Sequence, residues 1–434
     1  MKQIIPMLLV STLLIFQEAE AQNLLDLYDQ ASEYDPTLKV AKLQTEMTEA
    51  QRAQAGGALL PQINANVNLS MNQQLPNGLV REDSYRGERY NVSLTQTIFD
   101  APKLLNWERF YSIVEQYEAN QEDAQQAMMY NLVDRYFKVL EQLDNLNLVE
   151  QELTSTSKQL QQLQRQFEKQ LVQITDVYEL EAKQDTLVAD KIAIETALAV
   201  ARQNLKELTG QQHDDLALLR DDIEFPILPG DIEALVEKAK ALNPALIAQE
   251  KSIAAAEINV DQIKAKHLPT LDAQLTYFNT NTGYQNTQTP VVETEVAALN
   301  INVPLFSGGT TTHATEEAYK NLALNREKRQ AMLGTLIKDI HDSFLSTNAN
   351  VQRIQAAQKA LQSSTKAREA MEKGFQYNMQ TIGDVLVSQA RESKAKRDLL
   401  QAKYEYIKNR SRFERVTGQI NKEYLFGVNQ WLHD

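Results

Sequence analysis

The sequence of 434 residues contains no cysteine. This absence excludes disulfides, thiolate zinc sites, cysteine nucleophiles and a lipid-anchored N-terminal cysteine. Basic residues are also in the minority, since 44 Lys and Arg stand against 58 Asp and Glu and give a net charge of −14. Because no cluster of Lys or Arg interrupts this acidic balance, nucleic acid is not an expected partner.

Sequence patterns that mark common enzyme sites are missing as well. Gly308-Gly309 follows a predicted strand, but no Gly-Lys-Ser or Gly-Lys-Thr completes a phosphate-binding loop. No Gly-x-Ser-x-Gly is present, and the carboxylates are spread along predicted helices. The histidines show no metal-ligand spacing: they are His213, His267, His313, His341 and His433. We therefore expect no enzyme activity, no cofactor and no metal.

Long apolar runs are absent except at the N-terminus. Met1 and Lys2 precede the apolar segment 4–16, and the small-x-small pattern Ala19-Glu20-Ala21 follows it. This arrangement predicts a signal peptide over residues 1–21 and an exported protein. A membrane anchor is the alternative, but the run is shorter than the ~20 residues that a spanning helix needs. Any other insertion into a membrane would have to use strands.

Apolar residues recur every seven positions along two adjoining segments. They are Leu132, Val139, Leu146, Leu153, Leu160 and Phe167 in the first segment and Leu180, Leu187, Ile194, Ala201 and Leu208 in the second. This spacing predicts a coiled coil. Because a reversal fits only at 168–175, residues 102–209 are predicted to form a helical hairpin, whose first helix would span roughly 100 Å. A second hairpin is predicted over 309–417.

The sequence landmarks repeat at an offset of 208 residues (244 − 36 for two of the prolines). Asp35-Pro36 corresponds to Asn243-Pro244, Leu60-Pro61 to Leu268-Pro269, Ile174-Thr175-Asp176-Val177 to Ile382-Gly383-Asp384-Val385, and Leu208-Thr209-Gly210-Gln211 to Val416-Thr417-Gly418-Gln419. The period is too long for a solenoid repeat. It predicts an internal duplication, with repeats at 22–210 and 231–418, a connector at 211–230 and a C-terminal segment at 419–434.

Four segments alternate between apolar and polar residues and predict strands. Their approximate bounds are 62–71, 90–99, 270–278 and 296–303. Such strands suit either a sheet half-buried on a protein core or a barrel wall with lipid outside and water inside. The polar faces are rich in Asn and Gln rather than in Lys and Glu, and this composition favours the barrel. Since the smallest barrels have about eight strands, four strands would require an oligomer.

The order and repetition of these features resemble the TolC family of outer-membrane efflux and secretion ducts. The resemblance implies a mixed fold that is mostly α, in which three chains contribute four strands each to one outer-membrane β-barrel. A long periplasmic α-helical coiled-coil barrel would continue it. It further implies a homotrimer in outer-membrane lipid that works with a periplasmic adaptor and an inner-membrane pump of the ABC or RND type. The implied function is a trimeric exit duct for tripartite efflux or type I secretion.

The resemblance also implies a gate at the tips of the helical hairpins. Thr175 and Asp176 match the outer-hairpin residues that make polar contacts to the inner hairpin. Phe375 and Gln380 stand where the family's best-known member has a Tyr and an Arg. Because a phenyl ring has no hydroxyl group and an amide has no positive charge, a charge-assisted contact with Asp176 is not expected here.

Asp384 matches the first aspartate of the family's acidic ring at the periplasmic entrance, and Val387 occupies the position of the second. Three copies of Asp384 around an axis would favour cations in a narrow opening. Capping of a helix N-terminus is the alternative role for both Asp384 and Asp176.

Two other classes of protein fit part of the sequence. A coiled-coil periplasmic structural or adhesion protein would use the same heptads, but it would not need amphipathic strands of membrane length. A passive porin would explain the strands but not the long helices.

Overall fold

The structure is a computed structural model, and it describes residues 22–74, 83–377 and 379–433. The predicted signal peptide, residues 1–21, lies outside the described residues. The elements, in order, are α1 (Leu24–Tyr34), α2 (Pro36–Gly57), β1 (Gln62–Gln74), β2 (Asp83–Phe99), α3 (Ala101–Glu168), α4 (Ile174–Thr209), α5 (Ile232–Leu242), α6 (Pro244–Lys264), η1 (Ala265–His267), β3 (Thr270–Thr282), η2 (Tyr284–Asn286), β4 (Gln288–Asn302), α7 (Thr310–Gln376), α8 (Ile382–Val416) and α9 (Lys422–Asn429). The predicted mixed fold, mostly α with a small antiparallel sheet, is confirmed.

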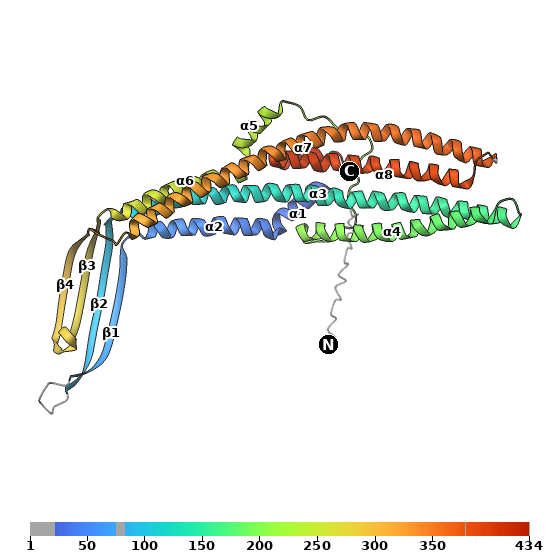
Figure 1. Cartoon of the computed structure of the whole chain (residues 1–434). Helices are drawn as coiled ribbons and strands as arrows, with labels where there is room; N and C mark the ends of the chain where they lie inside the picture. The colour runs from blue at the N-terminus through green and yellow to red at the C-terminus, as the bar shows by residue number, and fades with distance from the viewer. Residues whose placement is uncertain (1–21, 75–82, 378, 434) are drawn as a thin grey trace, which may run out of the picture.

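The long helices form a rod with the sheet at one end (Figure 1). α3 has 68 residues and α7 has 67, so each spans roughly 100 Å. α2 and α4 lie one after the other along α3, and α6 and α8 lie one after the other along α7. Since α3 also packs on α6 and α8, the helices form a wall in the order α2/α4, α3, α6/α8, α7. The helices α7 and α2/α4 therefore form the two edges of this wall.

The helix starts follow from local capping. Asp35 accepts a hydrogen bond from the backbone N–H of Thr37 and Asn243 accepts one from Leu246, each just before a proline that begins a helix. At the start of α3, Asp100 accepts a hydrogen bond from the backbone N–H of Lys103 at 2.9 Å. Gly418 ends α8 with a φ of +71°, and a Cβ there would lie 2.5 Å from the Leu242 carbonyl oxygen.

The strands pair antiparallel in the order β1-β2-β3-β4. They are longer than the sequence predicts, because ladder pairs such as Asn72 with Tyr85 and Asn68 with Arg89 extend the sheet through polar residues. Backbone hydrogen bonds hold these pairs irrespective of side-chain polarity. One face of the sheet exposes large apolar side chains, with Ile63 at 71% and Leu299 at 71% exposed. Within the described residues, the outer edges of β1 and β4 have no partner strand.

The main apolar core lies at mid-length, where α3, α4 and α8 meet α1 and α9. Leu132, Val139, Leu205 and Tyr404 are almost completely buried in it. The segment 211–230 crosses this core through isolated bridges from Leu216 to Gln22 and from Leu219 to Leu432. The core therefore joins both ends of the described chain to the middle of the rod.

Candidate functional site

The candidate site is the end of the rod opposite the sheet, where the two helical hairpins turn (Figure 1). α3 and α4 form one hairpin, called here the outer hairpin, and α7 and α8 form the other, called the inner hairpin. The six predicted residues lie in the last helical turn of α7, between α7 and α8, or in the first two helical turns of α4 and α8. The structure shows two different roles for them, capping and apolar packing.

Asp176 and Asp384 occupy equivalent positions in capping boxes. The carboxylate of Asp176 accepts a hydrogen bond from the backbone N–H of Gln173 at 3.2 Å, and the Thr175 hydroxyl donates to the Gln173 side chain at 3.4 Å. The carboxylate of Asp384 accepts from the Thr381 hydroxyl at 2.7 Å and from its backbone N–H at 3.1 Å. Each aspartate therefore stabilises a helix N-terminus.

The capping contacts also set the charge of Asp384. The hydrogen bond from the Thr381 hydroxyl, and then that from the Thr381 backbone N–H, hold the pKa of Asp384 below its usual value. The side chain is exposed and keeps its negative charge near neutral pH. Val387, one turn further along α8, is 52% exposed and adds no charge.

Phe375 is part of an apolar cluster that joins the two hairpin tips, called here the tip cluster. Its buried members are Leu160, Leu163, Val177, Leu180, Ile382 and Val385, and Val172, Met371, Phe375 and Leu386 pack against them. Gln380 is exposed, and its side chain lies over Gly374, where an added Cβ would come within 2.7 Å of it. Within the described residues, no hydrogen bond or ion pair links Phe375 or Gln380 to Asp176. Apolar packing therefore joins the tips within one chain.

A group of charged side chains around the buried Glu392 lies a few helical turns from the tips. No sequence motif predicts this group. Glu392 is 7% exposed; it forms an ion pair with Arg368, accepts a hydrogen bond from Thr365 at 3.0 Å and lies 3.4 Å from Lys396. Burial alone would raise the pKa of Glu392, but Thr365, Lys396 and Arg368 outweigh burial and hold this pKa below its usual value. The sequence signal was Arg368, which interrupts the apolar seam of α7.

Glu152 extends these charges across the two hairpins. Its carboxylate lies 2.8 Å from Lys183 of α4 and 3.7 Å from Arg397 of α8. A pocket of about 200 Å³ lies between the hairpins at this level, with Arg368 and Glu392 also in its lining. Polar contacts between the inner and outer hairpins thus exist in this chain, but they lie away from the tips.

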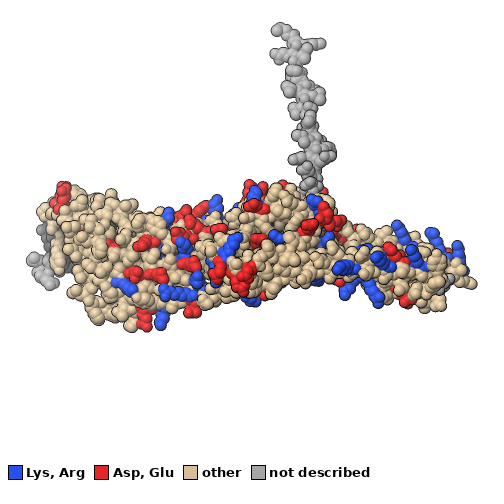
Figure 2. All heavy atoms as spheres, turned by 90° about the horizontal axis from the view of Figure 1, so that it is seen from above, with Lys and Arg blue, Asp and Glu red and all other residues tan. Residues whose placement is uncertain are grey.

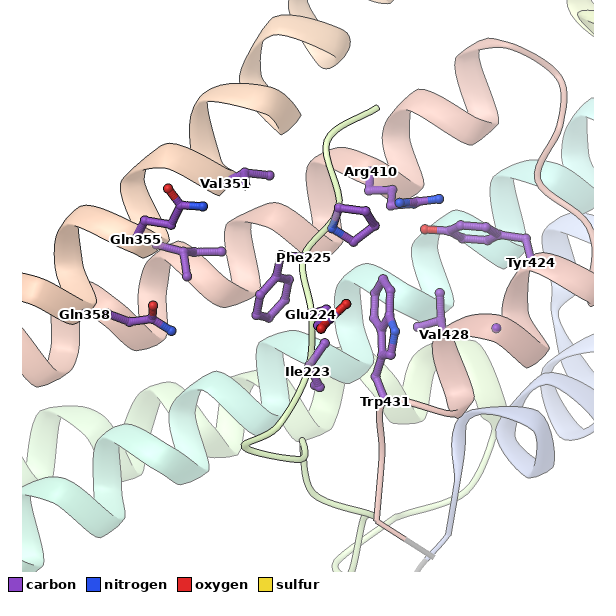
Figure 3. Close-up of a pocket in the computed structure, with 13 residues that line it drawn as sticks. Ile223, Glu224, Phe225, Val351, Gln355, Gln358, Arg410, Tyr424, Val428 and Trp431 are labelled. Carbon is purple, nitrogen blue, oxygen red and sulfur yellow. The ribbon is translucent and has the colours of Figure 1, made fainter. Parts of the chain in front are cut away.

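A larger pocket of about 630 Å³ lies at mid-length between the connector, α7, α8 and α9. Figure 3 shows Phe225 and Trp431 along its wall, with Arg410 and Tyr424 at one end. Arg410 donates to the Tyr406 hydroxyl at 3.1 Å, and the hydroxyls of Tyr424 and Ser411 are 2.8 Å apart. These hydroxyls and one Nη of Arg410 are therefore engaged within the protein.

Two further features bear on the kind of site present. In the part of the chain that the structure describes, no three His, Asp or Glu side chains gather in a way that could hold a metal ion. None of the described helices contains a stretch that is apolar enough, over a sufficient length, to cross a membrane.

Comparison with known proteins identifies relatives along the whole chain. The family model described as "Outer membrane efflux protein" matches residues 27–211 and 235–419. The outer membrane protein TolC of Vibrio cholerae is 30% identical over 100% of this chain and 99% of its own length. The alkaline protease secretion protein AprF of Pseudomonas aeruginosa is 26% identical over 94% of this chain and 87% of its own.

Solved structures show the same fold. The CmeC outer membrane channel of Campylobacter jejuni superposes with a TM-score of 0.81 at 16% identity, covering 95% of this chain and 90% of CmeC. VceC of Vibrio cholerae superposes with a TM-score of 0.76 at 17% identity, covering 91% of this chain and 96% of VceC. With the family model matching both halves, the chain belongs to the outer membrane efflux protein family.

Proposed function

We propose that this chain is one subunit of a homotrimeric exit duct in the outer membrane. The duct would receive substrates from an inner-membrane pump, through a periplasmic adaptor, for efflux or type I secretion. Membership of the outer membrane efflux protein family supports this proposal. The names of two relatives, the outer membrane protein TolC and the secretion protein AprF, support an outer-membrane location and a role in export.

The observation that carries the proposal is the open sheet. A sheet of four strands exposes an apolar face and leaves the outer edges of β1 and β4 without a described partner. In lipid, unpaired edges are too costly, and four strands cannot close on themselves. Pairing of β4 with β1 of the next copy would remove both edges, and three copies would then form one twelve-stranded barrel.

The two edges of the helical wall support the same ring. They expose large apolar side chains, which are Val40, Leu43 and Met47 on α2, Val188, Ile192 and Val200 on α4, and Tyr319, Leu324 and Leu345 on α7. In a ring, the α7 edge of one copy would meet the α2/α4 edge of the next. This head-to-tail contact would bury the apolar side chains and close a periplasmic tunnel.

An internal duplication underlies this architecture in our proposal. The two segments that match the family model begin 208 residues apart (235 − 27). Each half contributes a pair of short helices, two strands and a long helical hairpin. The predicted repeat 22–210 therefore supplies the outer hairpin, and the predicted repeat 231–418 supplies the inner hairpin.

We infer that the hairpin tips form the periplasmic entrance. Three copies of the exposed Asp384 around the axis would attract cations, while Val387 leaves the second acidic position empty. Thr175 and Asp176 cap the outer hairpin, and Phe375 packs in the tip cluster. Gln380 would lie beside that cluster without a charge to contribute.

The ring is tested on purified protein in detergent and in planar bilayers. We expect a trimer by light scattering and a steady single-channel conductance. Leu43→Glu places an acid on the apolar edge of α2, where Leu43 is 62% exposed, and is expected to weaken the trimer. Lys42→Glu is the matched control, since it changes the adjacent exposed position. A monomer that conducts no ions, or equal effects of both variants, contradicts the proposal.

A further inference from the structure

The two hairpins carry opposite net charge at the tip end of the rod. Residues 353–403 of the inner hairpin hold ten Lys and Arg against five Asp and Glu. Residues 150–191 of the outer hairpin hold five against eight. Figure 2 shows Lys and Arg gathered over the hairpin end when the rod is seen from the α7 and α8 side. In a chain of net charge −14, a basic surface of this size indicates an acidic partner.

Three lysines form a stripe along α7, called here the basic stripe: Lys359, Lys366 and Lys373. They are spaced by seven residues, so they lie on one side of the helix, and all three are exposed. Arg368, which turns toward Glu392 of α8, is two positions from Lys366 and therefore on a different side of the helix. In the described part of the chain, no ion pair or side-chain hydrogen bond engages the basic stripe.

The outer hairpin carries two carboxylates on one side of α4, called here the acidic pair: Glu181 and Asp185. Residues four apart share one side of a helix. Leu180 and Leu187 are buried against α3, whereas Asp185 is exposed and has no ion pair within the described residues. Glu181 accepts one hydrogen bond, from Gln164 at 3.3 Å.

Contacts within the chain place the basic stripe and the acidic pair at one level of the rod. Glu152 contacts Lys183 of α4 and Arg397 of α8. Glu392, little more than one helical turn from Arg397, contacts Arg368 of α7. The region of α4 near residue 183 and the region of α7 near residue 366 therefore lie within about two helical turns of the same level of the rod. These two regions lie at opposite edges of the wall. Among the long helices, α7 makes extensive contacts with α6 and α8 only.

We propose that the basic stripe of one copy pairs with the acidic pair of a second copy. This inference rests on the ring of the proposed function, in which α7 of one subunit adjoins α4 of the next. Ion pairs along each seam would then hold the entrance end of the ring closed from outside the tip cluster. Because such pairs are solvent-exposed, rising salt concentration weakens them.

Cross-linking tests the contact, and the absence of cysteine gives a clean background. We expect Lys366→Cys combined with Asp185→Cys to give linked dimers and trimers with a short bis-maleimide reagent. Lys394→Cys combined with Asp185→Cys is the control, because Lys394 is also exposed but lies on α8, away from the edge. Linked bands from the control pair alone, or from neither pair in an intact trimer, overturn the inference.

Charge reversal tests the role of the seam. We expect Lys359→Glu with Lys366→Glu to raise the conductance at low salt. Adding Glu181→Lys and Asp185→Lys to the same chain should return the conductance to that of the unmodified protein. At high salt, the conductance difference is expected to shrink. If the variants form a trimer and their conductance does not change, the ion pairs between subunits are refuted but the proposed duct is not. If the unmodified chain forms no trimer, the duct itself is refuted. Reversal that abolishes only adaptor binding also overturns the inference, because the basic stripe then serves a different partner.

Discussion

Removal of the Arg368 side chain tests whether the buried charges hold α7 and α8 together. In Arg368→Ala, Glu392 keeps Thr365 and Lys396 but loses its partner on α7, and it is only 7% exposed. Leaving a buried carboxylate with fewer partners costs about 1–3 kcal/mol. We therefore expect the backbone amides of α8 around Glu392 to exchange hydrogen about 5- to 150-fold faster, measured by mass spectrometry on the purified protein.

Arg353→Ala is the matched control. Arg353 also joins α7 to α8, through Glu405 at 2.7 Å, but the two side chains are 48% and 33% exposed. An exposed pair of this kind contributes less than about 1 kcal/mol, so exchange around Glu405 should change by less than about fivefold. Equal effects of the two substitutions would show that burial does not decide the strength of these ion pairs.

The pH dependence of the hydrogen-exchange rates around Glu392 gives a second test of the same contact. The folded-state pKa of Glu392 is lower than its unfolded value, so the charged side chain contributes stability above the unfolded pKa of about 4.3. That contribution is lost as the pH falls through the folded pKa. The difference between Arg368→Ala and the unmodified chain should therefore shrink on acidification below about pH 4. A difference that stays constant refutes the assignment to the Glu392 charge.

Three other substitutions have defined outcomes. Phe375→Ala removes half-buried apolar surface from the tip cluster and should weaken the contact between the hairpins by about 1–2 kcal/mol. We therefore expect a higher single-channel conductance for Phe375→Ala, whereas Phe375→Leu should change the conductance little. Asp384→Ala should weaken the block of that conductance by trivalent cations, because it removes the proposed acidic ring. Tyr404→Phe removes the hydroxyl that donates to Asp144 at 2.5 Å, so it should raise further the pKa of Asp144, already raised by burial, in a titration followed by NMR.

The long helices could be predicted because their apolar spacing is regular and their caps are local. Leu132 and Val139 belong to the heptad pattern and are fully buried, and Asn243 and Pro244 mark a helix start by their residue types alone. Strand ends could not be predicted in this way. β2 begins at Asp83, well before its apolar alternation, because ladder hydrogen bonds do not depend on the side chain.

The site was harder to predict than the fold, because its contacts join residues far apart in the sequence. Phe375 stands where the family's best-known member has a Tyr, and the sequence alone indicates only that a polar contact is missing. In the structure, its half-buried side chain packs against the tip cluster, whose members come from α3, α4, α7, α8 and the segment between α3 and α4. Arg368 was visible as an interruption of a seam, but its partner Glu392 lies across the hairpin turn and has no sequence signature.

The positions of these contacts imply different sensitivities along the rod. Opening the tips must expose the tip cluster, and the cost of exposing apolar surface changes little with salt or pH. Separating α7 from α8 within the inner hairpin must break the Glu392 contacts, and this step becomes easier in acid because the pKa of Glu392 is lowered in the fold. Separating neighbouring subunits must break the proposed exposed ion pairs, which weaken in salt. Conductance measured against salt at fixed pH, and against pH at fixed salt, therefore distinguishes which of these contacts limits opening.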